Sequence, residues 1–342
     1  MGELKRLVAR RPVLAYVVLC YGISWTVWLA IPWVASEWTL VKILTGVGIG
    51  PGLAAVLLDR ARGTAGALGN RRWWACFAPV FCGVVAIDLI SLLAGDGRTL
   101  QEAAAAEPVG LVPGGVIGSL LAAAACGFTF ACAATSRSPA LRSILEWRVP
   151  VRWWLIALLL PAALFLAGLG IDLALGGDPP APVWAGLSAA RYAALALRAL
   201  LFTLLVVAVG EEPGWRGWML PELQKRFSPL TSTLLVGVVW GLWHFPLFLN
   251  GMYPGPPEAI VQYLVIGPVL SVLFTWIYNR TTGVLLLALV LHTAINNTPR
   301  FVPGSDAFPV LLIALVVALV LAERMWRRPA PVAADRAPGL SR

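Results

Sequence analysis

Long apolar runs separated by short polar segments dominate the chain of 342 residues. Because about 20 consecutive apolar residues are enough for an α-helix to cross a bilayer, each run is a candidate membrane span. We therefore predict an all-α fold, a polytopic membrane helix bundle of about ten transmembrane helices. The predicted spans are residues 12–35, 39–58, 73–94, 109–135, 153–175, 192–210, 229–249, 260–278, 284–297 and 308–322.

The basic residues alternate between the connecting segments. Lys and Arg lie before the first run and after the second, fourth, sixth, eighth and tenth, whereas the other segments carry few of them. Cytoplasmic loops of membrane proteins are enriched in Lys and Arg. The alternation predicts a multi-pass protein of the cell membrane with both termini in the cytoplasm.

Composition supports a lipid-facing surface. Hydrophobic residues make up 59% and charged residues 13% of the chain, and the mean hydropathy is +0.81, whereas soluble domains have roughly 45–50% apolar and about 25% charged residues. The net charge of +9 does not indicate nucleic acid as a partner, because the basic residues cluster between apolar runs. The odd number of five cysteines predicts reduced, packed thiols rather than a disulfide framework.

Two adjacent carboxylates and an arginine lie at the end of the sixth run. Ionisable residues at membrane depth are expensive, and by default they mark a functional site. Arg216 follows Glu212 by four residues and shares its helix face, so we predict that it pairs with Glu212 and leaves Glu211 free as a general base. The alternative is a solvated helix end. Pro213 and Gly214 predict an interruption of the helix, either beside a cavity or as a plain kink.

The two histidines of the chain, His244 and His292, each lie inside an apolar run. A lone histidine in an apolar helix is more often a satisfied core residue. Two of them inside spans need polar partners within the bundle, since lipid offers none. The Glu211–Glu212 pair is the most obvious partner, and Asn296 shares a helix face with His292.

These side chains allow two hydrolytic schemes. Glu211, His244 and His292 could ligate zinc, although the usual close ligand spacing is absent. Alternatively, Glu211 and His244 take a proton from water while His292 and Asn296 donate to the carbonyl oxygen. We favour the scheme without a cofactor, because an amide beside His292 suits an oxyanion better than zinc, and we keep zinc as the alternative.

Three motifs in order carry a resemblance to a known family. They are Glu211-Glu212-x-x-x-Arg216, Trp240-x-x-x-His244 and His292-x-x-x-Asn296. Over about residues 202–322 the chain resembles the CPBP intramembrane proteases, which include the type II CAAX prenyl endopeptidases and the bacteriocin-immunity (Abi) proteins. Trp240 stands where that family usually has Phe, so an aromatic residue is kept.

The resemblance implies roles for these residues. Glu211 would be the general base, supported by His244, Glu212 and Arg216, and His292 with Asn296 would be the oxyanion donors. It also implies a division of the chain into N-terminal membrane helices of unknown role (1–190) and a catalytic membrane domain (191–322). The basic, Pro/Ala-rich composition of residues 323–342 predicts a disordered tail.

We therefore predict an intramembrane endopeptidase that hydrolyses peptide bonds of membrane-associated proteins or peptides. Its partners would be that substrate and the lipid bilayer, with no nucleic acid. One alternative is a proton-coupled transporter that uses Glu211, Glu212 and His244 as a proton relay. Another is a non-catalytic family member that serves as an immunity or scaffold protein.

One spacing conflicts with these boundaries. If the sixth helix ends at Gly210, Glu211 lies at the cytoplasmic end of that span, whereas His244 lies about 22 Å along the seventh. The two side chains meet only if the sixth helix continues past Glu211, to about Leu220, or if the seventh begins in the cytoplasm. The second run is rich in glycine, which predicts a close approach to a neighbouring helix.

Overall fold

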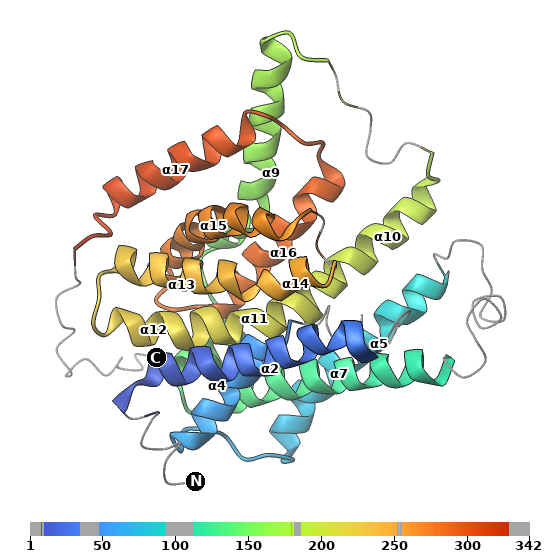
Figure 1. Cartoon of the computed structure of the whole chain (residues 1–342), viewed down its shortest axis with the longest axis vertical. Helices are drawn as coiled ribbons and strands as arrows, with labels where there is room; N and C mark the ends of the chain where they lie inside the picture. Colours follow the sequence, from blue (N-terminus) through green and yellow to red (C-terminus); the bar gives the residue numbers. More distant parts are fainter. Residues whose placement is uncertain are drawn as a thin grey trace.

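The fold was analysed in a computed structural model that describes residues 8, 10–34, 48–93, 112–178, 180, 186–251, 253 and 255–327. Within these residues the regular secondary structure is entirely helical (Figure 1), which confirms the predicted all-α class. A helix occupies part or all of each of the ten predicted segments. In the N-terminal half these helices are α2 (Pro12–Val34), α4 (Gly50–Ala61), α5 (Arg71–Leu93), α7 (Val112–Thr135), α8 (Pro139–Arg142) and α9 (Val151–Ala174).

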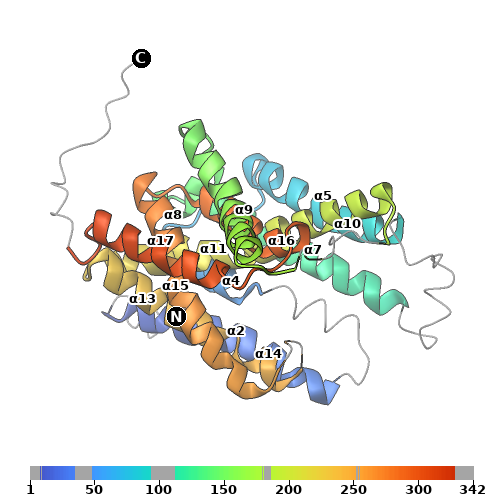
Figure 2. The ribbon, with the colours of Figure 1, turned by 90° about the horizontal axis from the view of Figure 1, so that it is seen from above.

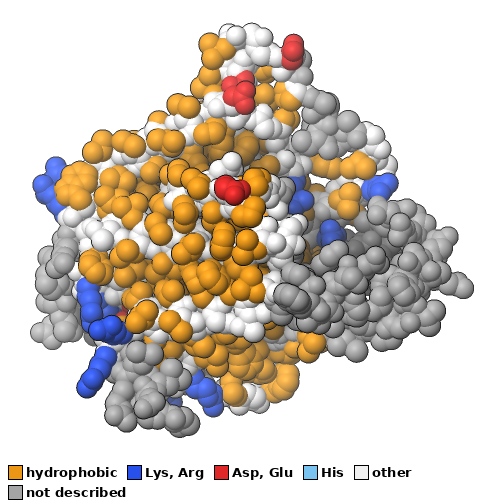
Figure 3. Space-filling model, in the orientation of Figure 1, with side chains coloured by type: hydrophobic (Ala, Val, Ile, Leu, Met, Phe, Trp, Pro, Cys, Tyr) orange, Lys and Arg blue, Asp and Glu red, His pale blue; other side chains and the backbone are white. Residues whose placement is uncertain are grey.

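Five of the described helices are long and apolar enough to cross a membrane. A sixth crossing results if Leu120–Thr135 and Pro139–Leu145, which are bent by 119° relative to each other, count as one span. The candidates are Pro12–Leu29, Val151–Ala174, Ala189–Gln224, Pro229–Leu249 and Pro257–Arg280. Helices α16 (Leu285–Phe301, 17 residues) and α17 (Phe308–Ala322, 15 residues) are shorter than a full crossing. The face seen in Figure 3 is largely hydrophobic, with Lys and Arg side chains gathered at its lower left edge, as a membrane-embedded surface requires.

The helix that carries the two glutamates is longer than predicted. It runs from Ala189 to Gln224, so the predicted end at Gly210 is wrong and the predicted continuation past Glu211 is confirmed. Its successive parts are α10 (Ala189–Phe202), the π-helical segment η2 (Thr203–Ala208), α11 (Val209–Gly214), the π-helical segment η3 (Trp215–Met219) and α12 (Leu220–Gln224).

The predicted interruption at Pro213 is also absent, because the backbone widens instead of breaking. The N–H of Val209 donates to the carbonyl of Leu204, and the N–H of Leu220 donates to that of Trp215, so each bond spans five residues rather than four. Single π-helical turns of this kind absorb local irregularity and are frequent at functional sites. Glu211 and Glu212 lie between the two widened segments.

A tight hairpin places Glu211 and His244 at the same depth. Helix α12 ends at Gln224 and α13 (Pro229–Trp243) begins after a short turn, with Ser228 capping the N–H of Thr231 at 3.2 Å. At 1.5 Å per residue, Glu211 lies about 20 Å before the turn and His244 about 22 Å after the start of α13. In Figure 1 these two arms run side by side, so the conflict in depth disappears.

The turns predicted to be cytoplasmic meet at one end of the bundle. Side-chain contacts connect the segments that follow the second and sixth predicted spans, the fourth and eighth, and the eighth and tenth. These contacts are Arg62–Glu222, Ser143–Gly283 and Arg280–Glu323. At the opposite end, the carboxylate of Asp172, in the last turn of α9, accepts from the N–H groups of Asp306 and Ala307 before α17. The loop alternation read from the charges therefore corresponds to two ends of the structure.

Helix α4 packs against the glutamate helix through glycine, as the glycine-rich second run predicted. A Cβ atom added at Gly52 would lie 2.7 Å from the carbonyl oxygen of Gly210, and one added at Gly214 would lie 2.4 Å from that of Pro51. Backbones can approach this closely only where side chains are missing.

Helix α2 braces the same region from another side. The Tyr21 hydroxyl donates to the carbonyl of Val239 at 2.6 Å, and the Trp25 indole donates to that of Trp243 at 3.0 Å. Figure 2 shows α2 beside α13 and α14 (Phe245–Leu249). The N-terminal helices thus support the elements that carry the candidate chemistry.

Candidate active site

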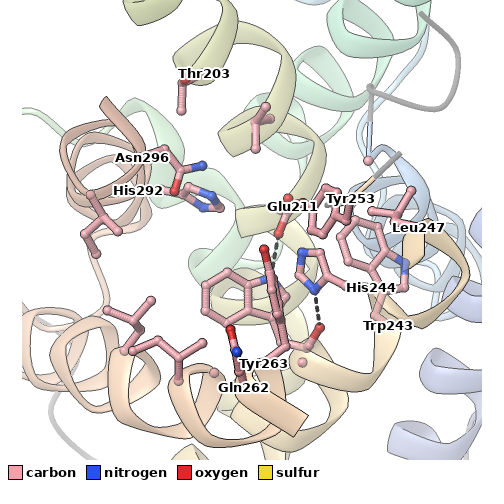
Figure 4. A pocket seen from close by; sticks show the side chains of 18 of the residues that line it. Thr203, Glu211, Trp243, His244, Leu247, Tyr253, Gln262, Tyr263, His292 and Asn296 are labelled. Carbon is pink, nitrogen blue, oxygen red and sulfur yellow. Dashed lines mark hydrogen bonds between the residues drawn. The ribbon is translucent and has the colours of Figure 1, made fainter. Parts of the chain in front are cut away.

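Four of the six predicted site residues line one cavity of about 1180 Å³. Glu211 of α11, His244 at the end of α13, and His292 and Asn296 of α16 all line it. Figure 4 shows these four side chains around a common space, with Tyr253 beside Glu211 and Tyr263 below. Residues of α15 (Ile260–Arg280) form much of the apolar wall, among them Val261, Val265, Ile266 and Leu270.

Glu212 is the centre of a closed, ion-paired cluster. Arg216 Nη1 donates to both of its carboxylate oxygens, at 2.9 and 3.1 Å, which confirms the predicted pair. His292 Nδ1 lies 2.6 Å from Glu212 Oε1. Arg216 Nη2 donates to Ser271 Oγ at 3.3 Å, and the guanidinium lies 3.8 Å from the ring centroid of Phe274. Glu212, Arg216 and His292 are at most 2% exposed. We call this buried network, which connects α11, η3 and α16, the lock.

Glu211 has different surroundings, although it is the adjacent residue. Its Oε2 atom accepts from the indole of Trp240 at 2.7 Å and from that of Trp215 at 3.3 Å. Among the described residues it forms no ion pair and no other hydrogen bond, so Oε1 keeps its accepting capacity. A carboxylate oriented by two neutral donors and open to a cavity has the arrangement of a general base.

His244 takes its partner from the backbone rather than from the glutamates, so the predicted pairing is wrong for this histidine. Its Nδ1 lies 2.8 Å from the carbonyl oxygen of Trp240. A carbonyl only accepts, so Nδ1 carries the proton and the neutral ring has an unprotonated Nε2. The rings of Trp243, Tyr253 and Tyr263 surround it, with centroids 4.9, 5.7 and 5.1 Å away.

Tyr253 adds a neutral donor at this side of the cavity. It lies in the loop after α14, outside the candidate spans, and burial raises the pKa of its phenol well above the usual value. The hydroxyl therefore keeps its proton at neutral pH. Neither Tyr253 nor Tyr263 belongs to a motif, and only their place in the fold brings them to His244.

Asn296 lies one helical turn beyond His292, as the spacing predicted. Its side chain is exposed to the cavity and lies beside the His292 ring in Figure 4. The next residue differs, because Asn297 is buried and donates to the carbonyl of Thr293 at 2.9 Å. Of the two adjacent amides, Asn296 alone lines the cavity.

Sequence reasoning missed several residues of the site. Trp215 follows Glu211 by four residues, so its helical spacing could have shown that it contacts the carboxylate. Gly48 and Trp28 line the cavity from the N-terminal region, and no local pattern marks them. The segment 1–190 therefore contributes to the wall of the site.

The candidate zinc ligands are not gathered as a metal site requires. Among the residues that the structure describes, no three His, Cys, Asp or Glu side chains are grouped so that they could hold one metal ion. His292 directs Nδ1 to Glu212, and Glu211 accepts two indole protons. The donor set does not fit the proposed Glu211, His244 and His292 ligation.

The fold and the site define a polytopic helical membrane protein with a buried acid–base cluster that opens on an apolar cavity. Residues 193–298 match the family model described as "Type II CAAX prenyl endopeptidase Rce1-like". This segment contains all three motifs, so the resemblance to the CPBP family is confirmed there; the match ends before α17, short of the predicted limit at 322.

A curated protein shows the same likeness. The chain is 37% identical over 106 residues to "CAAX prenyl protease 2" of Methanococcus maripaludis, which covers 28% of this chain and 38% of that protein. The chain thus matches less than two fifths of the length of this relative. Both descriptions are names of peptidases.

Proposed function

We propose that this protein is an intramembrane endopeptidase that hydrolyses peptide bonds of membrane-associated proteins or peptides. The observation that carries the proposal is the arrangement of two proton acceptors, Glu211 and His244, around the cavity that His292 and Asn296 also line. Such a set supplies the base, the positioning groups and the oxyanion donors that acyl transfer needs.

The attacking water would be held by two acceptors. Glu211 has a carboxylate oxygen free of protein partners, and His244 has an unprotonated Nε2, so a water between them directs both of its protons away from the substrate. Its oxygen lone pair then faces the carbonyl carbon. Glu211 takes the proton as the C–O bond forms, and Trp240 and Trp215 keep its carboxylate in place.

The developing oxyanion would face α16, which carries His292 and Asn296. Asn296 donates through its amide, and His292 donates through Nε2 when both ring nitrogens carry protons. Glu212 supports that imidazolium, because its oxygen lies 2.6 Å from Nδ1, and Arg216 in turn fixes Glu212. When the tetrahedral intermediate collapses, the C–N bond breaks and the proton held by Glu211 passes to the leaving amine.

The cavity supports an apolar substrate. A volume of about 1180 Å³ exceeds that of a single side chain, and aliphatic residues of α15 line it. The name of the Methanococcus maripaludis relative refers to a CAAX prenyl substrate. For this chain we propose the broader class of membrane-associated peptides, and we place the end with the basic turns, and both termini, in the cytoplasm.

Peptide cleavage by the detergent-purified chain tests this function. A library of quenched fluorogenic apolar peptides should reveal a cleaved sequence, and Glu211→Gln, His244→Ala and His292→Ala should each lower kcat/KM at least about 100-fold. Glu258→Gln, an exposed glutamate outside the cavity, is the matched control and should keep full activity. Retained cleavage in all three site variants would contradict the proposal, and proton flux in liposomes without cleavage would favour the transporter.

Chelation tests the mechanism separately. We expect the purified protein to keep its activity after exhaustive dialysis against a chelator, because the proposed step uses only side chains and water. Metal content is measured on the same sample. Stoichiometric zinc, with activity lost on its removal and restored on its return, would overturn the metal-free mechanism and leave the peptidase function standing.

A further inference from the structure

We infer that Arg300 is a substrate-binding residue that holds a carboxylate of the peptide about 12 Å along α16 from His292. The inference rests on the proposed function, and it adds a determinant of substrate choice. Arg300 lies in the last turn of α16 and lines the same cavity as Glu211, His244 and Asn296. It belongs to none of the three motifs.

Helical spacing aligns Arg300 with the proposed oxyanion donors. His292, Asn296 and Arg300 succeed one another at intervals of four residues, so they lie along one face of α16, and all three line the cavity. The rise from His292 to Arg300 is about 12 Å. An extended peptide advances about 3.3 Å per residue, so this distance corresponds to about three or four residues of substrate.

The charge of Arg300 has no counterpart in the described part of the protein. The side chain is exposed and forms no hydrogen bond or ion pair to a described residue, whereas Arg216, on the closed side, is fully paired. Of the described residues that line the cavity, Arg300 is the one Lys or Arg, and Glu211 is the one acid. A cation beside an apolar cavity at membrane depth or its edge is a functional-site candidate.

The guanidinium favours a carboxylate as its ligand. Its planar donors match the two oxygens of a carboxylate, and such charge-assisted pairs are the strong ones. A peptide offers a carboxylate in two ways, as its C-terminus or as an Asp or Glu side chain. Within three or four residues of the scissile carbonyl, either source would reach Arg300 while the amide remains at His292 and Asn296.

Peptide binding to the catalytically inactive Glu211→Gln variant tests the inference without requiring catalysis. The probe is a fluorescein-labelled apolar heptapeptide with a free C-terminus, compared with its C-terminal amide and with an amide that carries one Asp near its end. In the full-length Glu211→Gln protein, we expect the free acid to bind about tenfold more tightly than the amide by fluorescence anisotropy. The Asp peptide shows which carboxylate source is accepted.

Three second-site variants sharpen the test. Arg300→Gln should abolish the preference between acid and amide, Arg300→Lys should restore part of it, and Arg71→Gln, an exposed arginine remote from the cavity lining, should leave it unchanged. Equal binding of all three peptides before the substitution would overturn the inference. A loss of affinity in Arg300→Gln that is the same for all three peptides would do so too, because an arginine that only anchors the helix to lipid headgroups does not distinguish them.

The same set separates this inference from the proposed function. If the preference is present and depends on Arg300, but the otherwise unaltered protein cleaves neither peptide, the binding site stands and the peptidase function fails. If cleavage occurs with equal kcat/KM for all three peptides, the function stands and the role of Arg300 fails.

Discussion

The site has two halves, one around Glu212 and one around Glu211, and they differ although these two residues are adjacent in the sequence. On the closed side, Glu212 is held by Arg216 and His292 and is fully buried. On the cavity side, Glu211 meets two indole N–H groups and open space. Successive helical residues point about 100° apart, so one helix can direct one carboxylate to a lock and the next to a reaction space. The surroundings of each glutamate, rather than its side-chain chemistry, therefore determine its role.

The largest effect should come from breaking the lock. Arg216→Met removes the cation but leaves the Glu212 carboxylate buried, and a buried charge without its partner typically costs about 3–5 kcal/mol. We expect a marked loss of folded protein, measured as the free energy of unfolding in detergent and as the monodisperse fraction after extraction from membranes.

A matched control is the ion pair at the basic end of the bundle. Arg280 pairs with Glu323 at 2.7 Å, but its side chain is 56% exposed. Arg280→Met should lower the free energy of unfolding by about 1 kcal/mol or less. Equal effects of the two substitutions would show that the closed half is not a lock, and the comparison between the halves would fail.

A smaller loss of stability should follow from disturbing the glycine contact behind the lock. A Cβ at Gly214 would lie 2.3 Å from the Tyr16 hydroxyl and 2.4 Å from the Pro51 carbonyl oxygen. Because one obstacle is backbone, α4 must move away, and overpacking of this kind typically costs about 1–3 kcal/mol. Gly214→Ala should therefore lower the thermal midpoint of unfolding in detergent.

Gly170→Ala is the control for that substitution, because a Cβ there meets no atom within 4 Å. It should be neutral or slightly stabilising, since alanine favours helix. If Gly214→Ala were equally harmless, the N-terminal helices would not be packed on the glutamate helix as described. The N-terminal helices would then not support the site that the matched segment 193–298 forms.

More of the contacts in the closed half than in the cavity half could be predicted from the sequence. The Glu212–Arg216 pair was predictable because both residues lie on one helix, where a spacing of four implies contact. The contact of His292 with Glu212 was predicted only as a pairing of both histidines with the two glutamates, because lipid offers no polar partner, and it is realised for His292 alone. The end of the sixth helix was mispredicted because a Pro-Gly pair after two charges is typical of a helix end, whereas here the packed neighbours hold the chain in widened π-helical turns.

Much of the cavity half depends on residues that are remote in sequence, although the partner of His244 is the carbonyl of Trp240, four residues before it. His244 uses a backbone carbonyl, which every residue has, so no pattern identifies it. Trp28 comes from α2 and Gly48 from the segment just before α4, both outside the matched segment, and Tyr253 comes from a loop. The assignment of residues 1–190 to a separate domain remains a prediction, but these residues line the site.

The smallest effect concerns the orientation of the proposed base. Trp240→Phe keeps an aromatic ring between His244 and His292 but removes the indole N–H that lies 2.7 Å from Glu211 Oε2. Only the weaker bond from Trp215, at 3.3 Å, then holds the carboxylate. With its base less well oriented, the enzyme should lose about tenfold in kcat, or about 1.4 kcal/mol, while KM is unchanged.

Trp276→Phe is the matched control, because Trp276 makes a similar indole bond of 3.0 Å to Glu323, away from the cavity. It should leave both kinetic constants unchanged, and the two variants should have similar thermal midpoints. If Trp240→Phe lowered kcat no more than Trp276→Phe does, the indole would serve packing alone. If instead KM rose and kcat held, Trp240 would bind substrate rather than orient Glu211, and the division between a rigid lock and an oriented base would have to be redrawn at this residue.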